Sequence, residues 1–188
     1  MRIKGVMPVI VSEAECRRRE QGIYEDAGLR PDTKIEFVRI LKGPNYLSYY
    51  TECLDSEYNV LLEASKAEQE GYDAVQPDCV FDPAARALKE VLNIPVVAPL
   101  ECSLHLASLL GRKISILINE KEMIRFIEDK VREYGFEQKV VSIKVTDITY
   151  DELGFISGQR DKDAIDRKLI AIGTKAIEED GADVLIYA

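Results

Sequence analysis

Residues 70–75 read EGYDAV and residues 180–185 read DGADVL, so the chain repeats one short pattern at a distance of 110 residues. Each copy consists of an acid, a glycine, one variable residue, an aspartate and two apolar residues. The same step of 110 moves the apolar run at residues 3–10 onto residues 113–120, which contain another apolar run. Two pairs of positions share one offset, and we therefore predict two related halves.

Short β-type runs alternate with helical patterns along the chain. Strands separated by helices are joined by right-handed crossovers, which produce a mostly parallel sheet with helices on both faces. The sequence therefore predicts an α/β fold, with a first half at residues 1–99 and a second half at residues 100–188. The expected strands are 3–10, 34–41, 72–76, 94–98, 113–118, 140–145 and 182–187; the expected helices are 13–26, 44–70, 83–92, 101–110, 120–134 and 164–180, with a polar loop at 146–162.

Capping residues mark the expected ends of the helices. Ser12, Asp82 and Asn119 each stand where the N-cap of a helix is expected, and Pro83 suits a first helical position. Glycines follow the expected helix ends at Gly28, Gly71, Gly111, Gly135 and Gly181.

The chain of 188 residues carries a formal net charge of −9, from 25 basic and 34 acidic side chains. Nucleic-acid binding requires a clustered surface of Lys and Arg, so we expect no nucleic-acid partner. The basic run Arg17-Arg18-Arg19 is followed by Glu20 in an amphipathic stretch, which is typical of a solvated helix face.

The longest apolar run, residues 91–100, contains Asn93 and two prolines and is shorter than the roughly 18 residues that span a membrane. Glu13 and Glu15 directly follow the opening run, which does not fit a secretory signal peptide. We therefore expect no membrane partner and a cytoplasmic protein with reduced thiols.

The sequence offers no pattern for a metal or a common cofactor, and we expect neither. Its four cysteines form no CxxC pair, and His105 is the single histidine. The GxSxG, GxxxxGKS/T and GxGxxG motifs are absent, so phosphoryl transfer and dinucleotide binding lose their usual support. Cys16, Cys53 and His105 lie in helical patterns that favour packing roles, and Cys102 lies on a first helical turn without a further signature.

Cys79 is the candidate reactive group because it follows an expected strand, where ligands bind in parallel sheets. If a helix begins at Asp82 and Pro83, its free N–H groups and its dipole would lower the pKa of the thiol and hold a substrate carboxylate. A buried structural cysteine is the alternative.

Several stretches around Cys79 together form a known pattern. They read GYDAV at 71–75, CVFDP at 79–83, LKE at 88–90 and IPVVAPLE at 94–101. This order resembles the aspartate/glutamate/hydantoin racemase superfamily, in which a strand leads to a cysteine, a DP helix start follows, and an IPVVG strand precedes a helix with a Glu. Residues 1–4, Pro8 and the Gly43-Pro44 turn are similar to the hydantoin-racemase branch.

The resemblance implies a cofactor-independent racemase with two flavodoxin-like halves and an active site in the cleft between them. Each half of such an enzyme gives one cysteine: one thiolate removes the proton of the α-carbon, and the other thiol returns a proton on the opposite face. Inversion without a cofactor needs two acid/base groups on opposite sides of one carbon, and donors for the developing enolate. Cys79 matches the first cysteine of this pattern.

The repeat also predicts the position of the second cysteine. Cys79 follows Gly71 by eight residues, and the same spacing after Gly181 gives position 189, directly after Ala188. The second cysteine motif of the family likewise follows a GADVIVL-like strand, which residues 181–187 resemble. We expect the complete chain to carry a thiol near position 189.

Four further residues are candidates for substrate binding: Ser12, Val80, Phe81 and Glu101. Val80 and Phe81 follow the cysteine in the motif, and Glu101 matches the acid of the family's later helix, where first-turn electrostatics is the alternative role. Residues 7–10 read MPVI in place of the family's Asn-Pro-Asn-Thr, so Ser12 is a candidate replacement, or only an N-cap.

Asp78 stands beside the cysteine, where the family usually has a small or neutral residue. Its carboxylate opposes thiolate formation if it lies close to the sulfur, and has no such effect if it points away.

Racemisation of an amino acid or a hydantoin-like ring is the leading hypothesis, with a small molecule as substrate and a homo-oligomer as an open option. A maleate-isomerase-like enzyme of the same superfamily also stays open. The arylmalonate decarboxylase branch uses only the cysteine of the C-terminal half, which argues against it. A small-molecule-binding α/β module without turnover is the alternative that Asp78 and the missing Asn-Pro-Asn-Thr motif favour.

Overall fold

The structure, a computed structural model, describes residues 1–149, 152–154 and 161–188. The chain divides into two compact units, Met1–Leu100 and Glu101–Ala188, each with its own sheet. Residues 150–151 and 155–160 of the expected polar loop lie outside the described residues. Within the described ranges, no helix combines the length and the apolar character that crossing a membrane requires.

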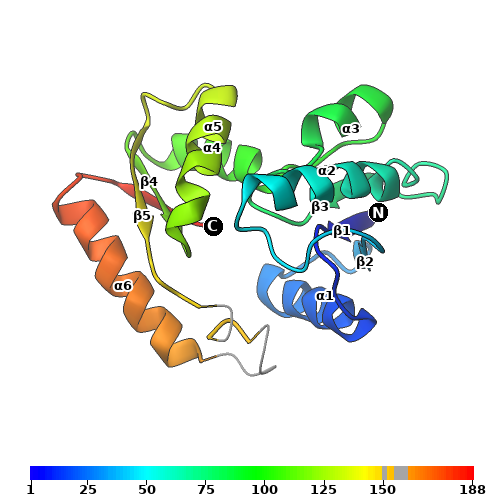
Figure 1. Cartoon of the computed structure of the whole chain (residues 1–188), viewed down its shortest axis with the longest axis horizontal. Coiled ribbons are helices and arrows are strands. Elements are labelled where there is room, and N and C mark those ends of the chain that lie inside the picture. Colours follow the sequence, from blue (N-terminus) through cyan, green and yellow to red (C-terminus); the bar gives the residue numbers. More distant parts are fainter. Residues whose placement is uncertain (150–151, 155–160) are drawn as a thin grey trace. The chain divides into compact units, whose positions relative to one another are not determined.

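The first unit contains a parallel sheet of three strands, β1 (Arg2–Met7), β2 (Lys34–Arg39) and β3 (Ala74–Pro77), in the order β2-β1-β3. Helices α1 (Glu13–Ala27) and α2 (Tyr50–Ala64) lie on opposite faces of this sheet, as Figure 1 shows, and α3 (Ala85–Val91) follows β3.

The side chains of β1 alternate between two small cores, which is why both faces of the sheet need a helix. Val6 is fully buried in a cluster with Val60 and Ala64 of α2, whereas Met7 is buried in a cluster with Cys16 of α1. Neighbouring residues of a strand face opposite sides, so consecutive apolar residues in β1 require cover on both.

The second unit repeats this topology. Its strands β4 (Ile114–Ile118), β5 (Val140–Val145) and β6 (Val184–Tyr187) are parallel and follow the order β5-β4-β6. Helices α5 (Ile124–Glu133) and α6 (Lys162–Glu178) lie on opposite faces of the sheet (Figure 1); α4 (Pro99–Leu110) precedes β4, and the 3-10 helix η1 (Lys121–Met123) precedes α5. The predicted α/β fold with parallel sheets is confirmed.

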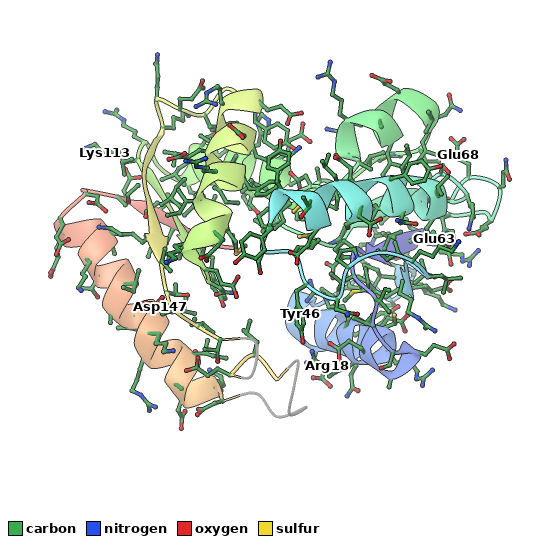
Figure 2. All side chains as sticks on the ribbon, in the orientation of Figure 1. Arg18, Tyr46, Glu63, Glu68, Lys113 and Asp147 are labelled. Carbon is green, nitrogen blue, oxygen red and sulfur yellow. The ribbon has the colours of Figure 1, made fainter. Side chains whose placement is uncertain are left out.

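One aspartate of each repeated phrase binds the backbone at the start of the central strand of its sheet. The Asp73 carboxylate accepts a hydrogen bond from the N–H of Arg2 at 2.6 Å, and the Asp73 N–H donates to the Arg2 carbonyl at 2.8 Å. Asp183 likewise accepts from the N–H of Lys113 at 2.8 Å and donates to the Lys113 carbonyl at 2.9 Å; Lys113 is labelled in Figure 2. The repeated phrase is therefore the turn before the third strand, and its aspartate binds that strand to the start of the central strand.

The acid of the first phrase, Glu70, binds a buried lysine. Lys4 of β1 is fully buried, and its Nζ lies 2.6 Å from Oε2 of Glu70 and 3.0 Å from Oε1 of Glu63, which is labelled in Figure 2. The backbone carbonyl of Glu63 accepts a third hydrogen bond at 3.0 Å. Burying an amine at this depth costs free energy unless opposite charges and acceptors surround it, as they do here.

Side chains of α1 cover the outer edge of β2. The hydroxyl of Tyr24 accepts a hydrogen bond from the N–H of Ile35 at 3.0 Å, and the carboxylate of Glu20 accepts one from the N–H of Phe37 at 2.7 Å. An edge strand with unpaired N–H groups is a template for pairing with another chain. Tyr24 and Glu20 occupy the two N–H groups, so these are not open to pairing with another chain.

Several predicted helix boundaries are confirmed. The hydroxyl of Ser12 accepts a hydrogen bond from the N–H of Glu15 at 3.2 Å, so Ser12 is the N-cap of α1. Gly28 ends the same helix with a φ of +55°, and Gly181 follows α6 with a φ of +70°. Glycine adopts this left-handed conformation without steric cost.

The strand predicted at residues 94–98 is wrong. This segment makes one parallel bridge, between Val96 and Val75, with hydrogen bonds from Val75 N–H to the Pro95 carbonyl at 3.0 Å and from Val97 N–H to the Val75 carbonyl at 2.8 Å. Pro95 lacks the N–H that a longer ladder needs, and α4 already begins at Pro99.

Three helix boundaries also differ from the prediction. The helix after Cys79 begins at Ala85 and not at Pro83, because Asp82 and Ala84 have φ values of +48° and +59° and cannot continue into a helix. Asn119 is not an N-cap; Glu120 precedes η1. The helix expected at residues 44–70 is shorter, since α2 covers only Tyr50–Ala64.

Replacing Asp183 with Asn tests the contact at the start of β4. Hydrogen bonds from the N–H groups of Lys113 and Arg112 hold the pKa of Asp183 below its usual 3.8. Ionised Asp183 therefore stabilises the fold above that value, and the contribution is lost as the pH falls through the lowered pKa. We expect Asp183→Asn to lower the urea midpoint near pH 7, by an amount that shrinks below about pH 4.

The control is Glu128→Gln, which removes an exposed carboxylate of α5. It should leave the urea midpoint near pH 7 almost unchanged. A loss of stability in Asp183→Asn that is equal at both pH values would mean that ionisation of this carboxylate plays no part.

Candidate functional site

Cys79 lies in the turn that follows β3, at the carboxyl edge of the first sheet. The N–H of Asp78 donates to the carbonyl of Val6 at 2.9 Å, which extends the pairing with β1 by one residue. The Cys79 carbonyl then accepts from the N–H of Asp82 at 3.0 Å, and the N–H of Phe81 binds the thiol. Backbone contacts on both sides therefore hold this half-buried free thiol in place.

Asp82 binds a helix other than the one that the sequence predicts. Its side chain is fully buried, and its Oδ1 accepts a hydrogen bond from the N–H of Leu100 at 2.9 Å, in the first turn of α4. The short helix α3 has another partner at its start, because the N–H of Ala84 donates to the carboxylate of Glu57 at 3.1 Å. The prediction that Asp82 caps a helix directly after Cys79 is wrong.

The pKa of the Cys79 thiol is raised to about 12, first by burial and then by the proximity of Asp78, Cys53 and Asp82; the hydrogen bond from the Phe81 N–H acts in the opposite direction. The prediction of a lowered thiol pKa is therefore wrong, since the expected helix terminus is missing and two carboxylates lie nearby. At neutral pH Cys79 is a protonated thiol, which is the form that gives a proton.

Arg19 of α1 pairs with the carboxylate of Asp78 beside the thiol. Its Nε lies 2.8 Å from Oδ2 and its terminal nitrogen 2.9 Å from Oδ1, and the amide of Gln76 donates to Oδ1 at 3.2 Å. The sequence analysis assigns Arg17-Arg18-Arg19 to a solvated helix face. Arg18 pairs with Glu15 of its own helix. Arg19 is also exposed, at 43% of its side chain, but in addition it reaches the Asp78 carboxylate, which the sequence analysis does not predict.

The four predicted substrate-binding residues lie in three places. Val80 and Phe81 share the turn with Cys79; Val80 is half-buried, and the Phe81 side chain is buried while its N–H binds the thiol. Ser12 is exposed at the start of α1, where its hydroxyl serves as the N-cap. Glu101 is half-buried in the first turn of α4, at the start of the second unit.

The carboxyl edge of the second sheet carries a polar cluster that the sequence analysis misses. The carboxamide oxygen of Asn119, directly after β4, accepts hydrogen bonds from the Tyr187 hydroxyl at 2.9 Å and the Thr146 hydroxyl at 3.2 Å. Tyr187 ends β6 and Thr146 directly follows β5, so each strand contributes one member. A polar residue at the end of each of three neighbouring strands is the signal that predicts such a cluster.

An open groove of about 340 Å³ lies beside α1 and β2. Acidic, basic and apolar side chains mix in its lining, and Cys79 is not among them. The lining residues are Glu13, Cys16, Arg17, Glu20, Phe37, Val38, Arg39, Leu41 and Glu63.

The remaining thiols and the histidine form no second centre. Burial raises the pKa of Cys16 and raises that of Cys53 to about 12, in keeping with the packing roles predicted for them. Cys102 is exposed on α4, and the exposed His105 packs edge-on against Phe136 with ring centroids 5.0 Å apart. Among the described side chains, no group of three His, Cys, Asp or Glu is placed to hold a metal ion.

The two units have the same strand order, and the first carries a cysteine turn at the carboxyl edge of its sheet. The protein is therefore an α/β protein built from two similar halves. The chain matches the family described as Asp/Glu/hydantoin racemase over residues 9–188 and belongs to that family.

The chain is similar to hydantoin racemases of three bacteria. It is 35% identical over 158 residues to that of Pseudomonas sp. (strain NS671), which is 84% of this chain and 61% of the relative. It is 26% identical over 155 residues to that of Paenarthrobacter aurescens, or 82% of this chain and 64% of the relative. With the Rhizobium meliloti protein the match covers 51% of the relative, so the chain spans less than two thirds of the length of these proteins.

Solved structures share the fold. The allantoin racemase from Klebsiella pneumoniae aligns with a TM-score of 0.85 at 20% identity, over 99% of this chain and 73% of that one. The allantoin racemase from Pseudomonas fluorescens aligns with a TM-score of 0.84 at 24% identity, over 100% of this chain and 76% of that one. At these identities the similarity shows the fold.

Alkylation of Cys79 tests the environment of the thiol. At about pH 8 a pKa of about 12 leaves a thiolate fraction roughly 10³-fold below that of an ordinary thiol, and the greater nucleophilicity of a more basic thiolate recovers part of this factor. We expect iodoacetamide to modify Cys79 about a hundredfold more slowly in the folded protein than in urea, as measured by peptide mass spectrometry.

The exposed Cys102 is the internal control, whose rate should change by less than about tenfold on unfolding. Faster alkylation of Cys79 in the folded protein would show that the thiol is activated and not suppressed.

Proposed function

We propose that the protein is a racemase that inverts the carbon next to a carbonyl in a hydantoin-type ring, with Cys79 as one of two acid/base groups. The observation that carries this proposal is the Cys79 turn at a sheet's carboxyl edge, in a chain of the Asp/Glu/hydantoin racemase family. The similarity to the hydantoin racemase of Pseudomonas sp. supports the ring as the substrate class. The two similar solved structures are described as allantoin racemases, and allantoin is itself a substituted hydantoin.

The chemistry requires one proton to leave and one to arrive. A C–H next to a ring carbonyl is acidic because its anion is delocalised as an enolate. One group removes the proton from one face, and a thiol on the other face donates a proton to the same carbon, with no oxidant or cofactor consumed. The protonated state of Cys79 suits the donating role, and the reverse reaction requires Cys79 to accept the proton. Reduced thiols of this kind are typical of the cytoplasm, where we propose the protein resides.

The second unit supports a second acid/base group at position 189. The N–H of Ala188 donates to the carbonyl of Leu117 at 2.8 Å, as the N–H of Asp78 donates to the carbonyl of Val6 at 2.9 Å. Ala188 is therefore equivalent to Asp78, and position 189 is equivalent to Cys79. We propose a thiol at this position; a coding sequence with another residue there, and none within the next few, would remove the two-thiol mechanism.

The polar cluster of the second unit suits the substrate. Asn119, Thr146 and Tyr187 lie at the carboxyl edge of their sheet, where position 189 would follow β6. The amide and hydroxyl groups of these side chains match the alternating carbonyl and N–H groups of a hydantoin ring. We propose that this cluster orients the ring.

The proposal is tested with the complete protein in deuterium oxide, using each enantiomer of a 5-substituted hydantoin and of allantoin. We expect deuterium at the inverted carbon, detected by NMR, because the returning proton comes from a group that exchanges with solvent. Cys79→Ser should lower the rate at least about 10²-fold, the usual contribution of an acid/base group.

Cys102→Ser is the matched control and should retain the full rate, since Cys102 is exposed on α4. An enzyme-free sample corrects for spontaneous exchange of these acidic protons. Absence of enzymatic deuterium incorporation with both rings would rule out the proposed reaction.

A small-molecule-binding module without turnover is the second candidate, and the raised pKa of Cys79 favours it. Calorimetric titration with the same rings separates the two. Saturable binding without deuterium incorporation would establish the module and exclude the racemase.

A further inference from the structure

Asp78, the residue beside Cys79, is held at both its backbone and its side chain. Its N–H donates to the Val6 carbonyl at 2.9 Å, and its carboxylate accepts the two hydrogen bonds from Arg19 and one from Gln76. The Asp78 side chain is only 7% exposed. Two parallel hydrogen bonds between a guanidinium and a carboxylate fix the direction of both groups as well as their distance.

The guanidinium of Arg19 is itself placed by a well-anchored helix. On α1, Glu20 and Tyr24 bind backbone N–H groups of β2, the strand on the far side of β1 from β3. The guanidinium carbon lies 5.8 Å from the ring centroid of Phe37 in β2. Helix α1 therefore brings a cation across the sheet to the turn that carries the thiol.

The two carboxylates near the thiol are each matched by a positive group. Asp82 accepts a hydrogen bond in the first turn of α4, where the helix dipole is positive, and Asp78 is bound by Arg19. Without its cation the Asp78 carboxylate presents an uncompensated negative charge to the sulfur, and a like charge disfavours the thiolate. Thiolate formation is required whenever Cys79 accepts a proton.

We propose that Arg19 is a positioning residue for Cys79: through its paired hydrogen bonds to Asp78 it holds the turn of residues 78–82 and offsets the Asp78 charge beside the thiol. This inference rests on the proposed acid/base role of Cys79. The competing explanation is an ion pair that stabilises the fold and has no influence on the sulfur.

The test compares R19Q, R19K, D78N and the double variant R19Q/D78N in the complete protein. The matched control is R18Q, because Arg18, labelled on α1 in Figure 2, is the neighbouring arginine of the same helix and forms an ion pair with Glu15 of that helix. For each variant we measure the rate of Cys79 alkylation against pH by peptide mass spectrometry, the melting temperature and the rate of deuterium incorporation.

R19Q leaves the Asp78 charge without its cation, so alkylation of Cys79 at about pH 10 should fall up to tenfold, the effect of one pKa unit. D78N removes the charge and should raise the rate by a similar factor. In R19Q/D78N the rate should recover to at least that of the unsubstituted protein, since no charge remains to be offset. R18Q should not change it.

R19K keeps the charge but not the two-pronged geometry, and should lie between R19Q and the unsubstituted protein. If R19Q does not fold, R19K replaces it in the test, with R18K as its matched control. Equal rates of Cys79 alkylation in R19K and R18K would overturn the proposal.

A fall in melting temperature without any change in the Cys79 alkylation profile would also overturn it, because a structural ion pair predicts that result. Failure of the proposed function looks different. In that case deuterium incorporation is absent from every variant and from the unsubstituted protein, while the alkylation rates still show whether Arg19 acts on the thiol.

Discussion

The hydrogen bond between the Asp73 carboxylate and the Arg2 N–H sets the register of β3 against β1. From this contact the pairing runs from Ile3–Ala74 to Val6–Pro77, and the chain leaves the sheet one residue later, with Cys79 next. A slip of one residue would move the thiol about 3.3 Å along the edge of the sheet and send its side chain to the other face. The placement of the Cys79 thiol thus begins six residues before it, at the exposed Asp73.

The second unit obeys the same constraint, which explains why the phrase recurs in the sequence. Asp183 holds the start of β4, and the pairing of Ser115 with Leu185 is equivalent to that of Lys4 with Val75. The offset is 110 residues in the third strands and 111 in the central strands, so the first unit has one residue more than the second between these two strands. Both halves keep the contact between this aspartate and the backbone at the start of the central strand, where the pairing of the two parallel strands begins.

Features determined by local chemistry could be predicted from the sequence, whereas those determined by distant contacts could not. Ser12 caps the helix that follows it, and the place of Cys79 after a strand follows from the order of the elements. The sequence predicts that Asp82 caps the helix nearest to it, but its left-handed backbone directs its side chain to Leu100 of α4, 18 residues away. The pairing of the exposed Arg19 with Asp78 could not be predicted, because a one-dimensional pattern cannot show that the turn after β3 lies beside α1. The pKa of Cys79 is raised by burial and by carboxylates that include Asp82, and the sequence pattern shows neither the burial nor the missing helix start.

Helix α1 is a single rigid element that contacts both β2 and the turn after β3. Glu20 and Tyr24 shield the margin of β2, while Arg19 reaches the turn after β3. Successive residues of an α-helix are rotated by about 100°, so adding or removing one residue upstream of Arg19 would swing its guanidinium and everything beyond it around the axis together. Helix α1 therefore tolerates substitutions at its solvent-exposed positions, whereas an insertion or deletion within it would misplace these side chains.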